Sequence, residues 1–223
     1  GIQANNLYGM ENGIEVTLAA PTPTHEYVDL GLPSGLLWAT CNLGASKPEE
    51  YGWYFMWGSV TEGGDPDCSW ANCPGNGGNS VYNSSAIAAW DTTHLTNNNV
   101  LKPEVDAASV NWGGDWRMPT ITEWEELYEN TTCTWIDNYN NTGVKGRVFT
   151  SRKEGYTDKN IFLPAAGYRS GTTLRDATYY GYYWSGSLSS SGSNQACSMY
   201  LQKNSVMQKG YARSNGCSVR PVR

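Results

Sequence analysis

Short alternations of apolar and polar residues dominate the chain after residue 25, and they predict short β-strands separated by turns. Before that point only Ile14, Val16 and Leu18 give a weak strand pattern. Residues 58–90 are rich in Gly, Asn and Ser, which predicts a long loop region. The predicted strands are 26–30, 36–41, 54–57, 147–151, 160–163, 182–184, 197–201 and 217–222.

Two segments carry helix-start signals instead. Pro103 suits the first turn of a short helix over 103–110. Thr120 followed by Glu123 forms a capping box, which predicts a second helix over about 121–130. Short strands with two short helices and long loops indicate an α+β domain. The apolar face of the second helix would carry Ile121, Trp124, Leu127 and Tyr128.

A Pro/Thr-rich stretch before His25 is typical of a stiff spacer, so residues 1–24 are expected to form an extension and 25–223 a single domain. The strand near residue 27 is expected to pair with 219–222 and bring the domain ends together. Five tryptophans are expected in the core: Trp38, Trp57, Trp116, Trp124 and Trp184.

Composition narrows the class of protein further. The chain has 15 Tyr and 10 Trp, 25 Gly and 10 Pro, and only 16% charged residues. These values argue against a coiled coil, a helical bundle or a disordered chain. No run approaches 18 apolar residues, so no transmembrane span is expected. A net charge of −6 argues against a nucleic-acid partner.

The C-terminal segment differs chemically from the rest. The last acidic residue is Asp176, and all the charged residues that follow it are basic. Of the 41 residues from Thr178 to Ser218, 24 are Ser, Tyr, Gly or Asn, which is typical of an antibody paratope. Hairpins with polar turns would have the same composition, and composition alone does not separate the two interpretations.

Six cysteines in a loop-rich chain suggest an oxidising compartment and allow fifteen full pairings. Cys68 and Cys73 could close a short local loop, and the alternative is that several cysteines are buried free thiols. The absence of a CxxC motif excludes a zinc ribbon or a thioredoxin-like site. The start at Gly1 is interpreted as a trimmed N-terminus whose export segment has been removed.

Candidate catalytic and metal-binding residues are few. His25 and His94 lie in no recognised motif, so surface or capping roles are expected for both. The adjacent pair Glu125 and Glu126 fits a solvated helix face better than a glycosidase site. A calcium site is conceivable in the Gly-rich loop that holds Glu62, Asp65 and Asp67, although the spacing is not that of an EF-hand. No cofactor is expected.

Eight segments of the chain carry a shared resemblance: 29–32, 37–45, 47–52, 112–120, 123–127, 161–168, 182–185 and 218–222. Together they resemble the Fibrobacter succinogenes major paralogous domain family, over roughly residues 26–223. That family is related to the C-type lectin fold and to the formylglycine-generating enzymes, so the resemblance implies a C-type lectin-like α+β fold.

The two related groups imply opposite functions. In the formylglycine-generating enzymes, two cysteines lie close together near the C-terminus, whereas here Cys197 and Cys217 are 20 positions apart. Oxidase activity is therefore not expected. The variable proteins of diversity-generating retroelements display diversified residues on a C-type lectin scaffold through a C-terminal segment. The Tyr/Ser/Gly/Asn-rich tail resembles that segment, so the chain is expected to be a non-catalytic binding domain.

The resemblance also suggests disulfide partners. The sequence contexts of Cys41 and Cys133 are similar to the family's, which makes them the first candidate pair. The other two candidate pairs are Cys68–Cys73 and Cys197–Cys217.

Strand periodicity predicts where such a domain would bind. In 197–201, Cys197, Met199 and Leu201 should face the core, and the alternating residues should face a ligand. The alternative is that the tyrosines at 200 and 211 are ordinary core residues. The predicted exposed patch consists of Tyr180, Ser189, Ser198, Tyr200, Lys209, Tyr211, Arg213 and Asn215.

The expected function is ligand binding or display by an exported, monomeric protein at the cell surface, lipid-anchored or secreted. The expected partner is a protein or glycan, because an aromatic and positive patch suits a polar or acidic macromolecule. A structural or adhesive surface module without a defined ligand is the first alternative, and an oxidase is the second.

Overall fold

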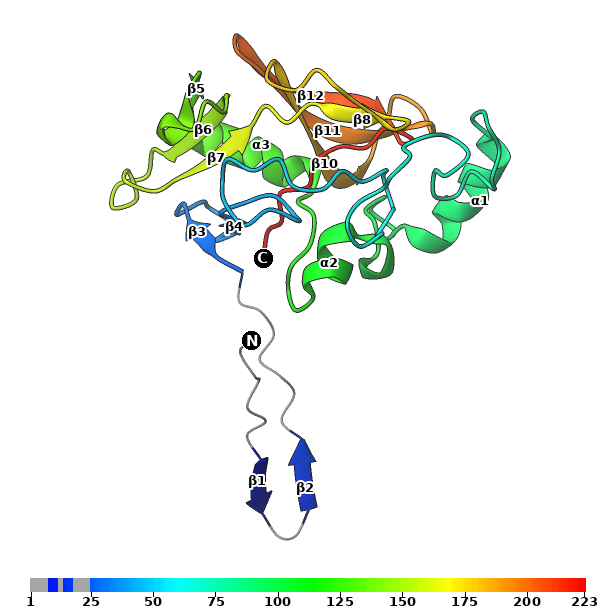
Figure 1. Ribbon diagram of the computed structural model, residues 1–223, viewed down its shortest axis with the longest axis horizontal. Helices are drawn as coiled ribbons and strands as arrows, with labels where there is room; N and C mark the ends of the chain where they lie inside the picture. Colours follow the sequence, from blue (N-terminus) through cyan, green and yellow to red (C-terminus); the bar gives the residue numbers. More distant parts are fainter. Residues whose placement is uncertain (1–7, 12–13, 18–24) are drawn as a thin grey trace.

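A computed structural model of the chain describes residues 8–11, 14–17 and 25–223 (Figure 1). The α+β class is confirmed: the sheets are small and antiparallel, and the helices are few and short. The helices are α1 (Ser84–His94), η1 (Pro103–Val105), α2 (Ala107–Trp112), α3 (Ile121–Asn130) and η2 (Tyr139–Asn141).

The strands of the described residues form five antiparallel sheets. Two-stranded sheets are formed by β1 (Tyr8–Glu11) with β2 (Ile14–Thr17), by β3 (Tyr27–Asp29) with β4 (Leu37–Ala39), and by β8 (Tyr168–Ser170) with β9 (Thr173–Arg175). Three-stranded sheets are formed by β5 (Thr131–Ile136), β6 (Gly146–Ser151) and β7 (Asn160–Pro164), and by β10 (Tyr180–Leu188), β11 (Gln195–Gln202) and β12 (Ser205–Ala212).

Helix α3 is confirmed with its capping box. The Thr120 hydroxyl accepts from the Glu123 backbone N–H, and the Glu123 carboxylate accepts from the Thr120 N–H at 2.7 Å. The guanidinium of Arg117 also donates to this carboxylate, at 2.6 and 2.7 Å. The start of α3 could be predicted from the sequence because all the residues that form it lie within eight consecutive positions.

The helix predicted over 103–110 is divided in two. Pro103 begins the 3-10 helix η1, and the chain becomes extended at Asp106. The Asp106 carboxylate then accepts from the N–H groups of Ala108 and Ser109 and starts α2. Asp106 is therefore an N-cap inside the predicted helix, because its side chain satisfies the first free N–H groups of α2.

Helix α1 was missed, because residues 58–90 were predicted to form a loop region that overlaps its start. Its apolar face is weak, with only Ile87 buried within the helix. Its N-cap is Asn83, whose side chain accepts from the Ala86 N–H, and no acidic residue follows in the first turn. Tertiary contacts, including the packing of Trp90 against Trp57, hold the helix to the domain.

The strand near residue 27 does not pair with residues 219–222, so this prediction is wrong. Strand β3 pairs with β4, and the C-terminal residue Val222 bridges to Trp38 of β4 and to Arg117. Strand β4 therefore lies between the two. The ends of the domain still meet, because the Arg223 guanidinium lies 5.2 Å from the Tyr27 ring centroid. Segment 54–57 likewise forms only an isolated bridge, through Phe55.

The sheet β10–β11–β12 lies between two hydrophobic clusters, with α3 against one of its faces (Figure 1). Tyr182 and Trp184 of β10 belong to one cluster, whereas Tyr183, Met199 and Leu201 belong to the other. The burial of the five tryptophans predicted for the core is confirmed, at 0–6% exposure.

A fully buried cation supports the C-terminal segment. The Arg220 guanidinium donates to the Asn42 side-chain oxygen and to the carbonyls of Ala39, Thr40 and Phe162, at 2.9–3.3 Å. Four neutral acceptors thus replace water around a charge that has lost its hydration. Burial lowers the pKa of Arg220.

The predicted Pro/Thr spacer lies mostly outside the described residues. Within the extension, the weak strand pattern corresponds to β2, which pairs with β1. None of the helices that the structure describes is both long and apolar enough to cross a membrane.

Candidate functional site

Five tyrosines gather on one face of the sheet β10–β11–β12. Tyr182 of β10 lies directly opposite Tyr200 of β11, so their side chains project from the same face. Tyr180 has the same parity as Tyr182, and Tyr211 of β12 lies opposite the small residue Ala196. We call this cluster the tyrosine face; its members are Tyr168 of β8, Tyr180, Tyr182, Tyr200 and Tyr211.

The rings of the tyrosine face touch one another continuously. Ring centroids are 4.7 Å apart between Tyr182 and Tyr211, 5.0 Å between Tyr182 and Tyr200, and 5.4 Å between Tyr180 and Tyr200. Tyr168 approaches Tyr211 edge-on at 5.2 Å. Such contacts fix the ring positions before any ligand arrives, which lowers the entropy cost of binding.

Burial raises the pKa of three hydroxyls of this face, those of Tyr182, Tyr200 and Tyr211. Burial raises the pKa of Tyr182 and of Tyr211 well above the ordinary value, and the nearby Tyr168 hydroxyl adds to the rise at Tyr211. Burial also raises the pKa of Tyr200. Tyrosine hydroxyls both donate and accept hydrogen bonds, so the face can offer a ligand either role.

The outer border of the tyrosine face is exposed and carries charges of both signs, because the Tyr182 hydroxyl also donates to the exposed Asp176 carboxylate at 3.5 Å. The Lys209 ammonium lies 5.2 Å from the centroid of the Tyr200 ring. Met207, opposite Tyr200 on β12, is 44% exposed, and Tyr179 is 68% exposed. Rigid aromatics beside a flexible cation are typical of surfaces that bind macromolecules.

Five of the eight predicted binding residues lie at the surface. Tyr180, Tyr200 and Tyr211 are half-buried members of the tyrosine face, and Lys209 is exposed. The structure thus brings these four together. Asn215 is half-buried in the turn after β12, where its backbone N–H donates to the Ala212 carbonyl.

Ser198 and Ser189 were wrongly predicted to be exposed. The alternation along β11 is as predicted, because Met199 and Leu201 share one face and Ser198 has the other. The second face is also covered, however, so Ser198 is fully buried and its hydroxyl donates to the Lys209 carbonyl at 2.9 Å. Ser189 is buried where its hydroxyl accepts from the Ser191 N–H.

Arg213 was also wrongly placed at the surface. Its side chain is 0% exposed, lies 4.5 Å from the Trp57 ring centroid and pairs with Asp91 of α1. Asp91 lies 122 positions from Arg213 in the sequence, so no local sequence pattern could predict the ion pair. Arg213 is therefore part of the buried scaffold and not of the tyrosine face.

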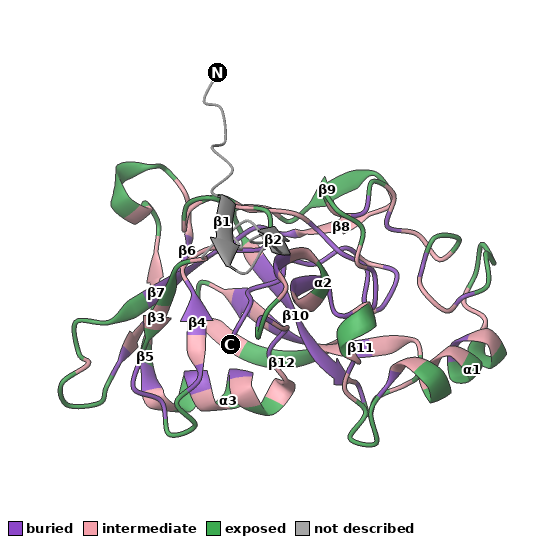
Figure 2. Cartoon of the chain, turned by 90° about the horizontal axis from the view of Figure 1, so that it is seen from below, coloured by how far each residue is buried: buried purple, intermediate pink, exposed green. Residues whose placement is uncertain are grey.

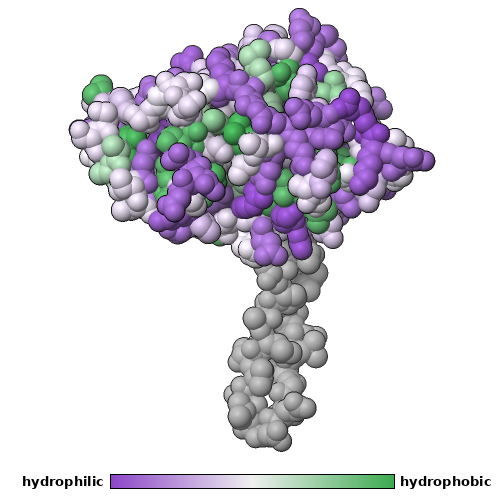
Figure 3. Space-filling model, turned by 180° about the vertical axis from the view of Figure 1, so that it is seen from behind, coloured by the Kyte–Doolittle hydropathy of each residue, from purple (hydrophilic) through white to green (hydrophobic). Residues whose placement is uncertain are grey.

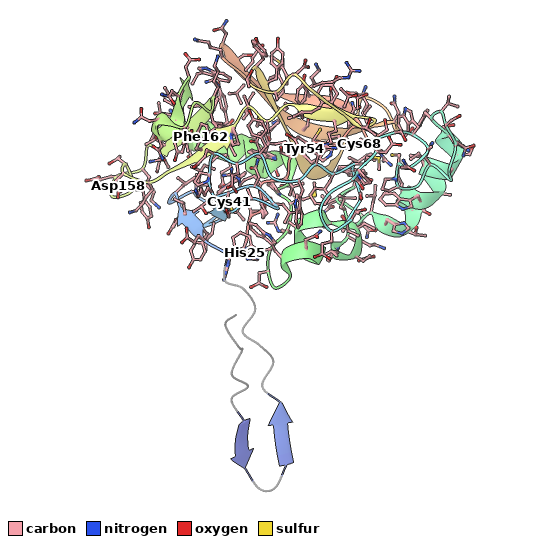
Figure 4. The ribbon with its side chains drawn as sticks, in the orientation of Figure 1. His25, Cys41, Tyr54, Cys68, Asp158 and Phe162 are labelled. Atoms are coloured by element: carbon pink, nitrogen blue, oxygen red, sulfur yellow. The ribbon has the colours of Figure 1, made fainter. Side chains whose placement is uncertain are left out.

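None of the three predicted disulfides is present, and all six cysteines are free. Cys41 packs against one hydrophobic cluster and Cys133 against the other, and Cys41 lies apart from Cys68 in the domain (Figure 4). Cys197 donates to the Leu188 carbonyl, whereas Cys217 is fully buried. Cys68 and Cys73 share a small cluster, and each donates to a carbonyl of its own loop.

The conceivable calcium loop does not assemble a site. The buried Asp65 carboxylate accepts from the Met56 N–H at 2.6 Å and from the Ser59 hydroxyl at 2.7 Å, while Glu62 is exposed. Across the described part of the chain, no three His, Cys, Asp or Glu side chains come together as a possible metal site.

Both histidines stack on tryptophans. His25 lies parallel to Trp112 with centroids 3.8 Å apart, where the chain enters the domain (Figure 4), and burial lowers its pKa. His94 stacks on Trp90 at 4.4 Å, and its Nδ1 lies 2.9 Å from the Trp90 carbonyl oxygen. These contacts stabilise the ends of the domain and of α1.

Sequence reasoning missed Tyr168 and Tyr182 as members of the site. Tyr182 shares the parity of Tyr180, so strand alternation could have included it. Tyr168 comes from another sheet, and its contact with Tyr211 spans 43 positions of sequence, which no local pattern encodes.

The family comparison covers the part of the chain that contains this face. A family model described as a domain of unknown function (DUF8237) matches residues 135–222, which include β10, β11 and β12. No curated protein and no solved structure matches the chain.

Proposed function

We propose that this protein is a non-catalytic binding domain that contacts a protein or glycan through the tyrosine face. The observation that carries the proposal is the run of touching tyrosine rings, in which half-buried Tyr180 and Tyr200 lie against buried Tyr182 and are bordered by Lys209. Tyrosine supplies a large contact area and a hydroxyl at low entropic cost. Lys209 at the border favours a ligand that places a polar or acidic group opposite it.

The fold we infer is C-type lectin-like, and the class is that of variable proteins of diversity-generating retroelements. Two observations support this: the short antiparallel sheets, and the contact of Tyr27 with Arg223 at the two ends of the domain. The full burial of Cys217 favours binding over an oxidase role. An exported or cell-surface location follows from the resemblance, and the six free thiols give it no support.

Natural sequence variation tests this proposal. Copies of the gene should be sequenced across one bacterial population, together with the neighbouring genes. We expect a reverse transcriptase gene nearby, and substitutions concentrated at the codons for half-buried Tyr200 and for exposed Met207 and Lys209. Substitutions spread equally over the buried codons for Met199 and Leu201 would contradict the proposal.

A further inference from the structure

Strand β12 is an outer strand of its sheet, and no strand of the described part of the chain pairs with its far edge. It has eight residues, and the stretch from Met207 to Lys209 is exposed. In Figure 2, β10 is mostly buried whereas β12 is exposed or intermediate. A long, accessible strand edge is a template for pairing with another chain.

The register identifies the free backbone groups of this edge. A two-residue turn joins Gln202 to Ser205, so these two residues form the first hydrogen-bonded pair of the hairpin. Such pairs recur at every second residue, and the bond from the Arg213 N–H to the Asn194 carbonyl continues the series. The backbone groups that point away from β11 are those of Val206, Gln208 and Gly210.

The opposite edge of the same sheet is covered by the chain itself. Backbone bonds link β10 to Gly167, to Asn99, to Leu101 and to Ser218 along its length. One edge is therefore closed within the molecule, and the other retains unpaired donors and acceptors at three alternate residues.

A groove runs beside the open edge, between α3 and β12. Its cavity has a volume of about 240 Å³, with Met199 and Val206 among its lining residues. Tyr128 of α3 and Met207 border it, at 47% and 44% exposure. Side chains of a strand added to β12 would point alternately into this groove and away from it.

We propose that the open edge of β12 receives an extended segment of another protein, with basic side chains at every second position. Glu125 and Glu129 of α3 line the groove and are exposed. The ion pairs found in the described part of the chain involve neither carboxylate. Lysine or arginine stems would cover Tyr128 while their charges reach these two carboxylates.

Charge argues for a different protein rather than a second copy. A second β12 strand, paired antiparallel, would direct Val206, Gln208 and Gly210 into the groove, and none carries a charge. Each copy also has a net charge of −6, so approach of two copies is opposed at low salt.

Synthetic peptides as long as β12 provide the probe, one alternating Lys with Val and a second alternating Glu with Val. We expect only the Lys peptide to bind and to slow amide exchange at Val206, Gln208 and Gly210. Equal binding of the two peptides, or no binding of the Lys peptide, would overturn the proposal.

Two variants separate backbone pairing from general attraction. Gln208→Pro removes one outward N–H without breaking a bond to β11, and Gln208→Ala is its matched control. We expect Gln208→Pro to weaken the Lys peptide about tenfold and Gln208→Ala to leave it unchanged. Glu125→Gln with Glu129→Gln should also weaken binding.

Three outcomes oppose the inference. Full affinity in Gln208→Pro would show that the peptide does not extend the sheet. Protection of the tyrosine face instead of β12 would place the peptide at the other site. Dimerisation of the wild-type chain that Gln208→Pro abolishes would identify a second copy as the occupant. If Gln208→Pro lowers the thermal midpoint, the variant is not interpretable. The amide exchange of the wild-type protein with the Lys peptide then decides whether the peptide pairs with β12.

Discussion

The Arg213 guanidinium donates two hydrogen bonds to the Asp91 carboxylate, from Nη1 to Oδ1 and from Nη2 to Oδ2, each at 2.8 Å. The pair joins α1 to the segment that follows β12. Arg213 also lies over the Trp57 ring, in the hydrophobic cluster against which Tyr211 packs. The ion pair therefore connects the tyrosine face to α1, the helix that the sequence pattern did not predict.

Removal of one partner should destabilise the domain strongly. Asp91→Asn leaves the fully buried Arg213 charge without a counter-charge, so we expect a loss of about 3 kcal/mol or more. Asp137→Asn breaks the exposed pair with Lys203 and should cost much less, because solvent screens that pair. Urea denaturation of both variants measures the difference, and equal small losses would show that the buried pair is dispensable.

The buried tyrosines should make the protein sensitive to alkaline pH. Burial raises the pKa of Tyr54, Tyr182, Tyr183 and Tyr211 in the folded state. Above about pH 10 the unfolded chain ionises and the folded chain does not, so stability is present below that pH and is lost as pH rises.

Each such tyrosine adds up to about 1.4 kcal/mol of loss per pH unit above that point. Urea denaturation at a series of pH values between 8 and 11 measures this fall in the free energy of unfolding. Tyr211→Phe should make the pH dependence shallower. If the wild type and Tyr211→Phe show the same slope, the Tyr211 hydroxyl does not contribute.

The six free cysteines should react at different rates with a thiol reagent, even though none of them needs to be reduced first. Burial raises the pKa of Cys68 and Cys73 to about 12 and also raises that of Cys217, whose side chain is fully buried, so their reactive thiolate forms are scarce. A disulfide-forming reagent should modify Cys217 slowest in the native protein. All six thiols should react after unfolding, and a smaller number would reveal a disulfide that the structure lacks.

Local sequence signals predicted the elements whose causes are local. The capping box of α3 lies between Thr120 and Glu123, and the alternation along β11 separated Met199 from Tyr200 correctly. The exposure of each face was not predictable in this way. Ser198 is buried because a second cluster covers its side of the sheet, which depends on residues far away in the chain.

The composition of the tyrosine face was predictable only in part for the same reason. Tyr180, Tyr200 and Lys209 follow from strand parity, whereas Tyr168 reaches the face from a different sheet. On the side of the molecule seen in Figure 3, hydrophobic residues form small patches separated by hydrophilic ones. Such a surface gives no compositional signal of where a ligand binds.

The chain offers a matched control for the tyrosine face. On the loop between β6 and β7, Lys153 lies 5.0 Å from the Tyr156 ring centroid, which repeats the geometry of Lys209 over Tyr200 at 5.2 Å. Both tyrosines are half-buried and both lysines are exposed. A pair of double variants therefore removes the same chemical groups from two different places.

The most direct test measures the affinity of peptides selected against the wild-type protein from a random display library. We predict that Tyr200→Ser with Lys209→Ser weakens the selected peptides about tenfold or more, since aromatic anchors dominate such interfaces. Tyr156→Ser with Lys153→Ser should leave their affinity unchanged, and both variants should unfold at similar urea concentrations. Equal affinity of the two double variants for these peptides would contradict binding through the tyrosine face.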